Sequence, residues 1–217
     1  MKNRKKKKTG CSCFEAIRPI DRNPLKHLLR MGRDIKCMYQ RIKYGYCFRD
    51  IWDINRWFLD VVPNMLEELK EETCAYPTGP DDFSQTAGTI DEDDSNERYE
   101  AGLQKWKDTL SEMIFLLREA NEETCTRENP YGAEYDKAVD EFTKKFGWFG
   151  EGLKTKEEKR EEDRRGFYTL YTPSDVPEYK KISKLYFDEE AVLHEYRNSC
   201  KDKGLELFKK WFWNLWD

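Results

Sequence analysis

Residues 50–72 read DIWDINRWFLDVVPNMLEELKEE, and this stretch gives the strongest indication of the fold class. Its apolar side chains recur at spacings of three and four residues, which is the period of an α-helix. They cover so much of the helix circumference that the helix must pack inside a bundle. Pro63 interrupts the pattern and predicts either a kink or a break into two helices.

The helical period recurs along most of the remaining chain. It predicts further helices at residues 31–44, 97–121, 131–149, 178–185 and 188–216. A short run at residues 167–172, between a glycine and a proline, is the only candidate strand. The expected fold class is therefore all-α, an irregular helical bundle of about five or six helices with long charged loops.

Two stretches without a buried face divide these helices. Residues 76–96 combine proline, glycine and many acidic residues, which is typical of a long loop. Residues 150–177 include KTKEEKREEDRR, which is either an exposed helix or a disordered connection. We expect a basic tail at residues 1–16 followed by a single helical domain at residues 17–217.

The composition excludes several classes of protein. Of the 217 residues 38% are charged, but 12 Phe, 12 Tyr and 7 Trp are more aromatic residues than a disordered chain carries. No apolar run is long enough to cross a bilayer, so we expect no transmembrane segment. The seven cysteines are scattered and odd in number, which favours a reducing cytoplasm over a disulfide scaffold.

Positive charge is concentrated near the N-terminus. Residues 1–48 contain 14 Lys or Arg against 3 Asp or Glu, whereas the rest of the chain is acidic. Such an arm is attracted to the phosphates of nucleic acid or of a membrane surface. Alternatively it is a solvated tail, or it docks on the acidic part of its own chain. The candidate phosphate contacts are Arg4, Lys5, Lys6, Lys7, Lys8, Arg33, Lys36, Arg41 and Lys43.

The second unusual stretch is LFKKWFWNLWD at residues 207–217. Its aromatic residues surround a helix almost completely, so the bundle covers both sides or part of the stretch stays exposed. An exposed aromatic end would offer a surface for a partner or for self-association. The candidate partner residues are Trp211, Phe212, Trp213 and Trp216.

No catalytic, cofactor or metal motif is recognisable. The only histidines are His27 and His194, and neither has the spacing of a metal site on a helix. The chain has no phosphate-binding loop, no G-x-G-x-x-G and no G-x-S-x-G. Cys11 and Cys13 would need two more ligands at a recognisable spacing to bind zinc. We therefore expect no enzyme activity, no cofactor and no metal.

One segment resembles a group of viral proteins. Residues 41–59 read RIKYGYCFRDIWDINRWFL, residues 63–66 read PNML, and residues 215–217 read LWD. This pattern is similar to that of uncharacterised small helical proteins encoded by phages and prophages of Gram-positive bacteria. The resemblance implies a phage origin and a place in the cytoplasm of the bacterial host cell, and it implies no particular activity.

These observations lead to one functional hypothesis and two alternatives. The hypothesis is a phage-encoded, non-catalytic interaction protein, an accessory or anti-defence factor that binds a host protein or a nucleoprotein target stoichiometrically. The first alternative is a nucleic-acid-binding accessory protein that uses the basic N-terminal arm. The second is a virion or assembly component, which would form homo-oligomers.

Overall fold

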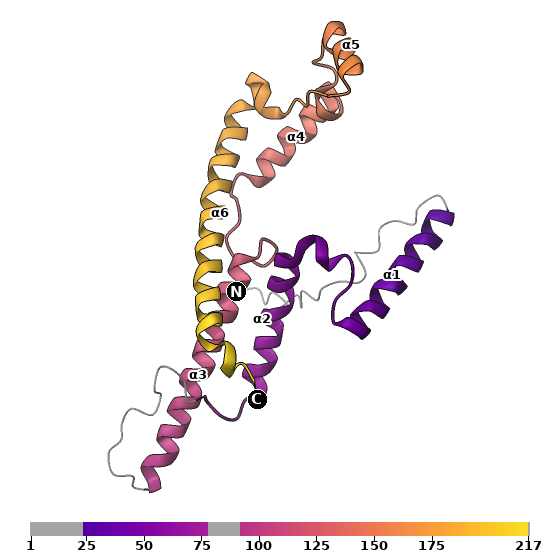
Figure 1. The fold of residues 1–217 in the computed structure, drawn as a ribbon. Helices are drawn as coiled ribbons and strands as arrows, with labels where there is room; N and C mark the ends of the chain where they lie inside the picture. The colour runs from indigo at the N-terminus through magenta and orange to yellow at the C-terminus, as the bar shows by residue number, and fades with distance from the viewer. Residues whose placement is uncertain (1–23, 78–91, 217) are drawn as a thin grey trace. The chain divides into compact units, whose positions relative to one another are not determined.

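The computed structural model describes residues 24–77 and 92–216, and it describes the side chains of residues 31–77 and 99–216. Within these ranges the chain is all-α and contains no β-strand, so the predicted fold class is confirmed (Figure 1). The helices are α1 (Pro24–Tyr44), α2 (Ile54–Glu72), α3 (Glu92–Ala120), α4 (Gly132–Phe146), α5 (Lys156–Arg165) and α6 (Pro177–Trp211). Four short 3-10 helices separate or end them: η1 (Asp50–Asp53), η2 (Trp148–Gly150), η3 (Pro173–Asp175) and η4 (Phe212–Asn214).

Helix α2 begins later than the sequence pattern indicates. The carboxylate of Asp53 accepts a hydrogen bond from the backbone N–H of Arg56 at 3.4 Å and so caps the helix N-terminus. Residues before this cap form the 3-10 turn η1, in which Trp52 is 89% exposed rather than packed inside a bundle. Pro63, where the sequence predicts a kink or a break, is buried inside α2, and the helix continues through it without a break.

The candidate strand at residues 167–172 does not form, because the backbone groups of this segment bond to other elements. The N–H of Tyr171 donates to the carbonyl of Phe149 at 3.0 Å. The N–H of Thr169 donates to the carboxylate of Glu162 at 2.6 Å. The segment is therefore an extended connection held against its neighbours by single hydrogen bonds.

The chain divides into two compact units, which are described separately. Unit 1 takes residues up to Thr124 and again from Ser199 onward, whereas unit 2 consists of Cys125–Asn198. Helix α6 contributes its first part to unit 2 and its last turns to unit 1. The single domain expected for residues 17–217 stays a prediction.

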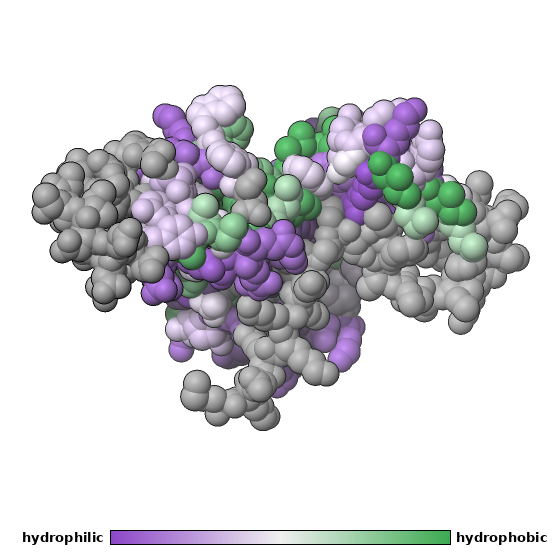
Figure 2. Space-filling model, turned by 90° about the horizontal axis from the view of Figure 1, so that it is seen from below, coloured by the Kyte–Doolittle hydropathy of each residue, from purple (hydrophilic) through white to green (hydrophobic). Residues whose placement is uncertain are grey.

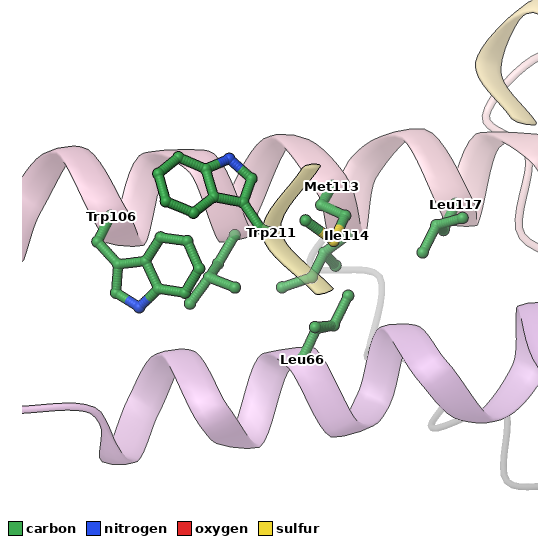
Figure 3. Close-up of a cluster of buried hydrophobic side chains, with 7 residues drawn as sticks. Leu66, Trp106, Met113, Ile114, Leu117 and Trp211 are labelled. Carbon is green, nitrogen blue, oxygen red and sulfur yellow. The ribbon is translucent and has the colours of Figure 1, made fainter. Parts of the chain in front are cut away.

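The core of unit 1 lies between α2, α3 and the last turns of α6 (Figures 1 and 3). Its buried side chains are Leu66, Trp106, Leu110, Met113, Ile114, Leu117 and Trp211. The rings of Trp106 and Trp211 lie 5.1 Å apart and are tilted by 58°. Such aromatic pairs add about 1 kcal/mol to the gain from burial, so α6 is held firmly against α3.

Polar contacts tie α2 to the C-terminal end of α3. The side-chain amide of Asn121 donates to the buried carboxylate of Asp60 at 2.7 Å. Arg118 forms an ion pair with Glu67, and Arg56 forms one with Glu123. Because buried polar groups need partners, the Asp60–Asn121 pair fixes the register of the two helices.

Unit 2 has a smaller core built on α4 and the first turns of α6. The buried residues are Ala138, Phe142 and Tyr179, with partly buried side chains packed around them. Tyr135 of α4 and Tyr186 of α6 stack with ring centroids 4.2 Å apart. The two helices are thus joined along their length by aromatic contacts.

Helix α5 contains no apolar residue, so the caps at its ends and one ion pair position it. Thr155 and Glu158 form a reciprocal capping box at its start, and Gly166 ends it in the left-handed conformation. The ammonium group of Lys154 lies 3.0 Å from the carboxylate of Glu162, and both side chains are buried. Of the two structures considered for this charged stretch, the helix is the one that forms.

Candidate functional site

The C-terminal aromatic stretch splits into a buried and an exposed part. Trp211 is only 1% exposed and belongs to the unit 1 core. The interpretation of Trp211 as a partner residue is therefore wrong, because α3 and α2 already cover its ring. In Figure 3 the Trp211 ring reaches toward Trp106 on α3.

The residues after Trp211 turn outward in η4. Trp213 is 84% exposed, Trp216 is 71% exposed, and Phe212 is about half exposed. We call these three residues the C-terminal aromatic surface. The indole N–H of Trp216 donates to the carbonyl of Trp213 at 3.0 Å, which ties the two exposed residues together.

A series of ring contacts supports this surface from below. Phe58 of α2 meets Phe208 of α6 edge to face, with centroids 5.6 Å apart. Phe208 meets Phe212 at 5.7 Å, and Phe212 meets Trp213 at 5.2 Å, both edge to face. The exposed rings are therefore positioned by the packed part of unit 1, which lowers the entropy lost when a partner binds them.

The basic candidates on α1 have different surroundings. Arg41 donates two hydrogen bonds to the carboxylate of Asp50, at 2.5 and 3.2 Å, so it serves this internal ion pair and does not offer a free phosphate contact. Arg33, Lys36 and Lys43 are exposed. The lysines lie over aromatic rings: Lys36 over Phe48, and Lys43 over Tyr39 and Tyr44. Arg4 and Lys5, Lys6, Lys7 and Lys8 lie outside the described residues.

The ion pair of Arg41 is part of a buried turn that anchors α1. Burial by itself would raise the pKa of Asp50, but hydrogen bonds from Arg41 and from the Cys47 backbone N–H outweigh it and lower the pKa. Beside it, Cys37 and Cys47 are buried free thiols. Burial, together with a hydrogen bond to Cys47, raises the pKa of Cys37 to about 11. This thiol stays protonated at neutral pH, which suits a packing role rather than a reactive one.

The apolar side of α1 is exposed. Ile35 is 62% exposed and Ile42 is 82% exposed, and Met31, Met38 and Tyr39 between and beside them are also exposed. Figure 2 shows green hydrophobic residues among purple hydrophilic ones on the face of the molecule that it draws. The periodicity identified this face correctly, but periodicity alone does not say what covers it.

A further exposed group in unit 2 was not anticipated. Its members are Trp148, Phe149, Phe167, Tyr168 and Leu170. Phe149 has a φ of 55°, a left-handed conformation that is unusual for a residue with a side chain. The signal available in the sequence was the pair of aromatic dipeptides beside glycines, GWFG at 147–150 and GFY at 166–168.

The exposed side chains described above are of the types found on binding surfaces. Within the described residues no three His, Cys, Asp or Glu side chains gather closely enough to hold a metal ion. None of the described helices combines the length and the apolar character needed to cross a membrane. What the described residues do offer is exposed aromatic and aliphatic side chains beside cationic ones.

No protein-family model, curated protein or solved structure matches this chain.

Proposed function

We propose that the protein is a phage-encoded, non-catalytic interaction protein that acts in the cytoplasm of a bacterial host. It binds a host or defence protein stoichiometrically, alone or within a nucleoprotein complex. The observation that carries this proposal is the C-terminal aromatic surface, where Trp213 and Trp216 are largely exposed beside the packed core.

The physical basis is the cost of leaving large aromatic rings in water. Exposed apolar groups on a supported surface are typical of interaction sites. Tryptophan is enriched among the residues that dominate binding energy, because it buries a large area with few rotatable bonds. The ring contacts from Phe58 through Phe208 and Phe212 hold this surface in place before any partner arrives.

The test is capture of partners by the tagged full-length protein from infected or lysogenic cells, with nuclease added and mass spectrometry as the readout. The captured protein is then purified and its affinity is measured directly. We expect Trp213→Ala combined with Trp216→Ala to lower this affinity by about a hundredfold or more, since both are candidate hot spots.

A matched control separates this surface from exposed tryptophan in general. Trp148 is 76% exposed in unit 2, and Trp148→Ala should leave the affinity unchanged. If Trp148→Ala abolishes binding while the double variant binds normally, the partner surface lies in unit 2. If nuclease removes every captured partner, the protein–protein proposal fails.

The alternative of nucleic-acid binding has its own supporting observation. Lys43 lies beside the rings of Tyr39 and Tyr44, with its ammonium group 5.8 and 5.1 Å from the two centroids. Cations interleaved with exposed rings suit a single strand, whose phosphates and bases they can contact together. This alternative requires an affinity for oligonucleotides that falls steeply with salt.

The remaining alternative, a virion or assembly component, would use the C-terminal aromatic surface between copies of the chain. It requires oligomers in sedimentation velocity that dissociate in the Trp213→Ala and Trp216→Ala double variant. A wild-type protein that sediments as a monomer at high concentration excludes it.

A further inference from the structure

Helix α1 carries a continuous apolar stripe on one side. Its members are Met31, Ile35, Met38, Tyr39 and Ile42, at intervals of four, three, one and three residues. This spacing places all five on one face of an α-helix. All five are exposed, Ile42 most of all.

The rest of the circumference of α1 already makes contacts within the protein, on the far side and along one edge of the stripe. Cys37 is buried there, and Gln40 accepts a hydrogen bond from the Phe48 backbone N–H at 3.1 Å. Arg41 pairs with Asp50, and Asp34 pairs with Arg49 at 2.8 Å. These contacts fix the helix against the turn at residues 45–50 and leave the stripe on the outside.

Positive charge borders one edge of the stripe and adjoins the stripe in sequence. Lys36 and Lys43 lie at its edge by helical position, and both are exposed. In the sequence, residues 1–48, which include the stripe, have 14 basic against 3 acidic side chains. An occupant of this face must therefore offer an apolar layer bordered by negative charge.

We propose that α1 binds the surface of an anionic lipid membrane, lying in the plane of the headgroups. The apolar stripe inserts beside the upper acyl chains, and Lys36 and Lys43 contact lipid phosphates, as in other interfacial amphipathic helices. The helix lies on the membrane and does not cross it. This role is separate from binding of a protein by the C-terminal aromatic surface.

Two other occupants fit the stripe less well. Nucleic acid would satisfy the lysines but would leave Ile35 and Ile42 in water, because its outer surface is polar. A second copy packed face to face and antiparallel would bring Lys36 and Lys43 of both chains together, and like charges at an interface are unfavourable. The surface of an anionic membrane offers both an apolar layer for the stripe and phosphates for the lysines.

The turn after α1 has side chains that suit the same environment. Trp52 in η1 is the most exposed tryptophan among the described residues, and Tyr44 and Tyr46 are about half exposed. Tryptophan and tyrosine are enriched at membrane–water interfaces, where an apolar ring and a polar edge are both accommodated.

The experiment is flotation of the full-length protein with vesicles of two compositions, phosphatidylcholine alone and equal parts phosphatidylcholine and phosphatidylglycerol. We expect binding to the anionic vesicles only. Ile35→Asp with Ile42→Asp should weaken the binding by about tenfold or more, because charged groups then replace the inserted side chains. Lys36→Glu with Lys43→Glu should weaken it by a similar factor.

The matched control is Val192→Asp with Leu205→Asp, which changes exposed aliphatic residues on α6 and should leave vesicle binding intact. Circular dichroism shows whether each variant keeps its helices. If the variant with Ile35→Asp and Ile42→Asp binds vesicles as well as the wild type does, the proposal is overturned, because the basic residues alone would then explain the binding. A wild-type oligomer that binds no vesicles and dissociates with the same aspartates also overturns it, because a second copy would then cover the stripe.

Discussion

Asp60 is nearly buried in unit 1, and its surroundings disfavour its charged form. Burial raises the pKa of Asp60, and the nearby carboxylates of Glu123 and Asp53 act in the same direction. The hydrogen bond from Asn121 and the charge of Arg56 act against this rise but do not cancel it. A carboxyl group with a raised pKa in the folded state stabilises the fold most where it is protonated, and this contribution is lost as the pH rises through the folded-state pKa.

We therefore predict that Asp60→Asn stabilises the protein at neutral pH. The amide oxygen can still accept from Asn121 at the position now 2.7 Å away, while the buried charge is gone. In urea titrations the variant should unfold at higher denaturant than wild type at neutral pH. The difference in stability between the variant and the wild type should disappear at a pH below 3.8, the ordinary pKa of aspartate. A variant that is less stable at neutral pH would mean that the charge, through Arg56, is worth more than its burial costs.

For single residues, the sequence identified the important side chains more reliably than it predicted which of them are buried. It picked out Trp211, Trp213 and Trp216 together, and the structure separates the first from the other two. The separation depends on α6 ending at Trp211 and η4 turning the next residues outward. The helical period put Trp211 on one face with Phe208 and Leu215, and Trp213 and Trp216 off that face, but it did not indicate whether the bundle covers both sides.

For single helices, features set by neighbouring residues can be predicted from the sequence, whereas features set by packing against other elements cannot. The capping box of α5 is readable in the sequence, because Thr155 is followed three residues later by Glu158. The exposure of the α1 stripe is not readable, because it depends on what packs against the helix. The helix at residues 31–44 was predicted, and its start at Pro24 was missed.

We predict that Thr155→Ala destabilises α5 by about 1 kcal/mol, the usual cost of removing a threonine N-cap. The Thr155 hydroxyl accepts from the Glu158 backbone N–H at 3.2 Å, and little apolar packing exists to compensate for its loss. Hydrogen exchange of the α5 amides measures the effect. The neighbouring exposed Lys156→Ala is the control and should leave exchange unchanged, whereas equal exchange in Thr155→Ala and wild type would contradict the prediction.

Residues 24–77 and 92–216 are all-α as predicted, but the division of the chain into two units has no local signal in the sequence. Unit 1 joins α2 and α3 to the last turns of α6, across the whole of unit 2 in sequence. Such long-range packing follows from shape and burial, which periodicity along the chain does not encode.

If the units have separate cores, a cavity in one should leave the other intact. Leu110→Ala in unit 1 and Phe142→Ala in unit 2 each remove a buried side chain and should each cost about 3 kcal/mol. Hydrogen exchange followed by mass spectrometry should show lost protection in the mutated unit alone. Equal loss throughout the chain in both variants would mean that the two cores unfold as one.

In the sequence, unit 2 lies between the two parts of unit 1, and this order affects how the protein is synthesised. The ribosome completes residues 125–198 before it adds Trp211, which closes the core of unit 1. The part of unit 1 before residue 125 therefore leaves the ribosome well before Trp211 can cover it. Until Trp211 arrives, the side chains of α2 and α3 that it covers stay exposed, and translational pauses after residue 124 should lengthen this exposure.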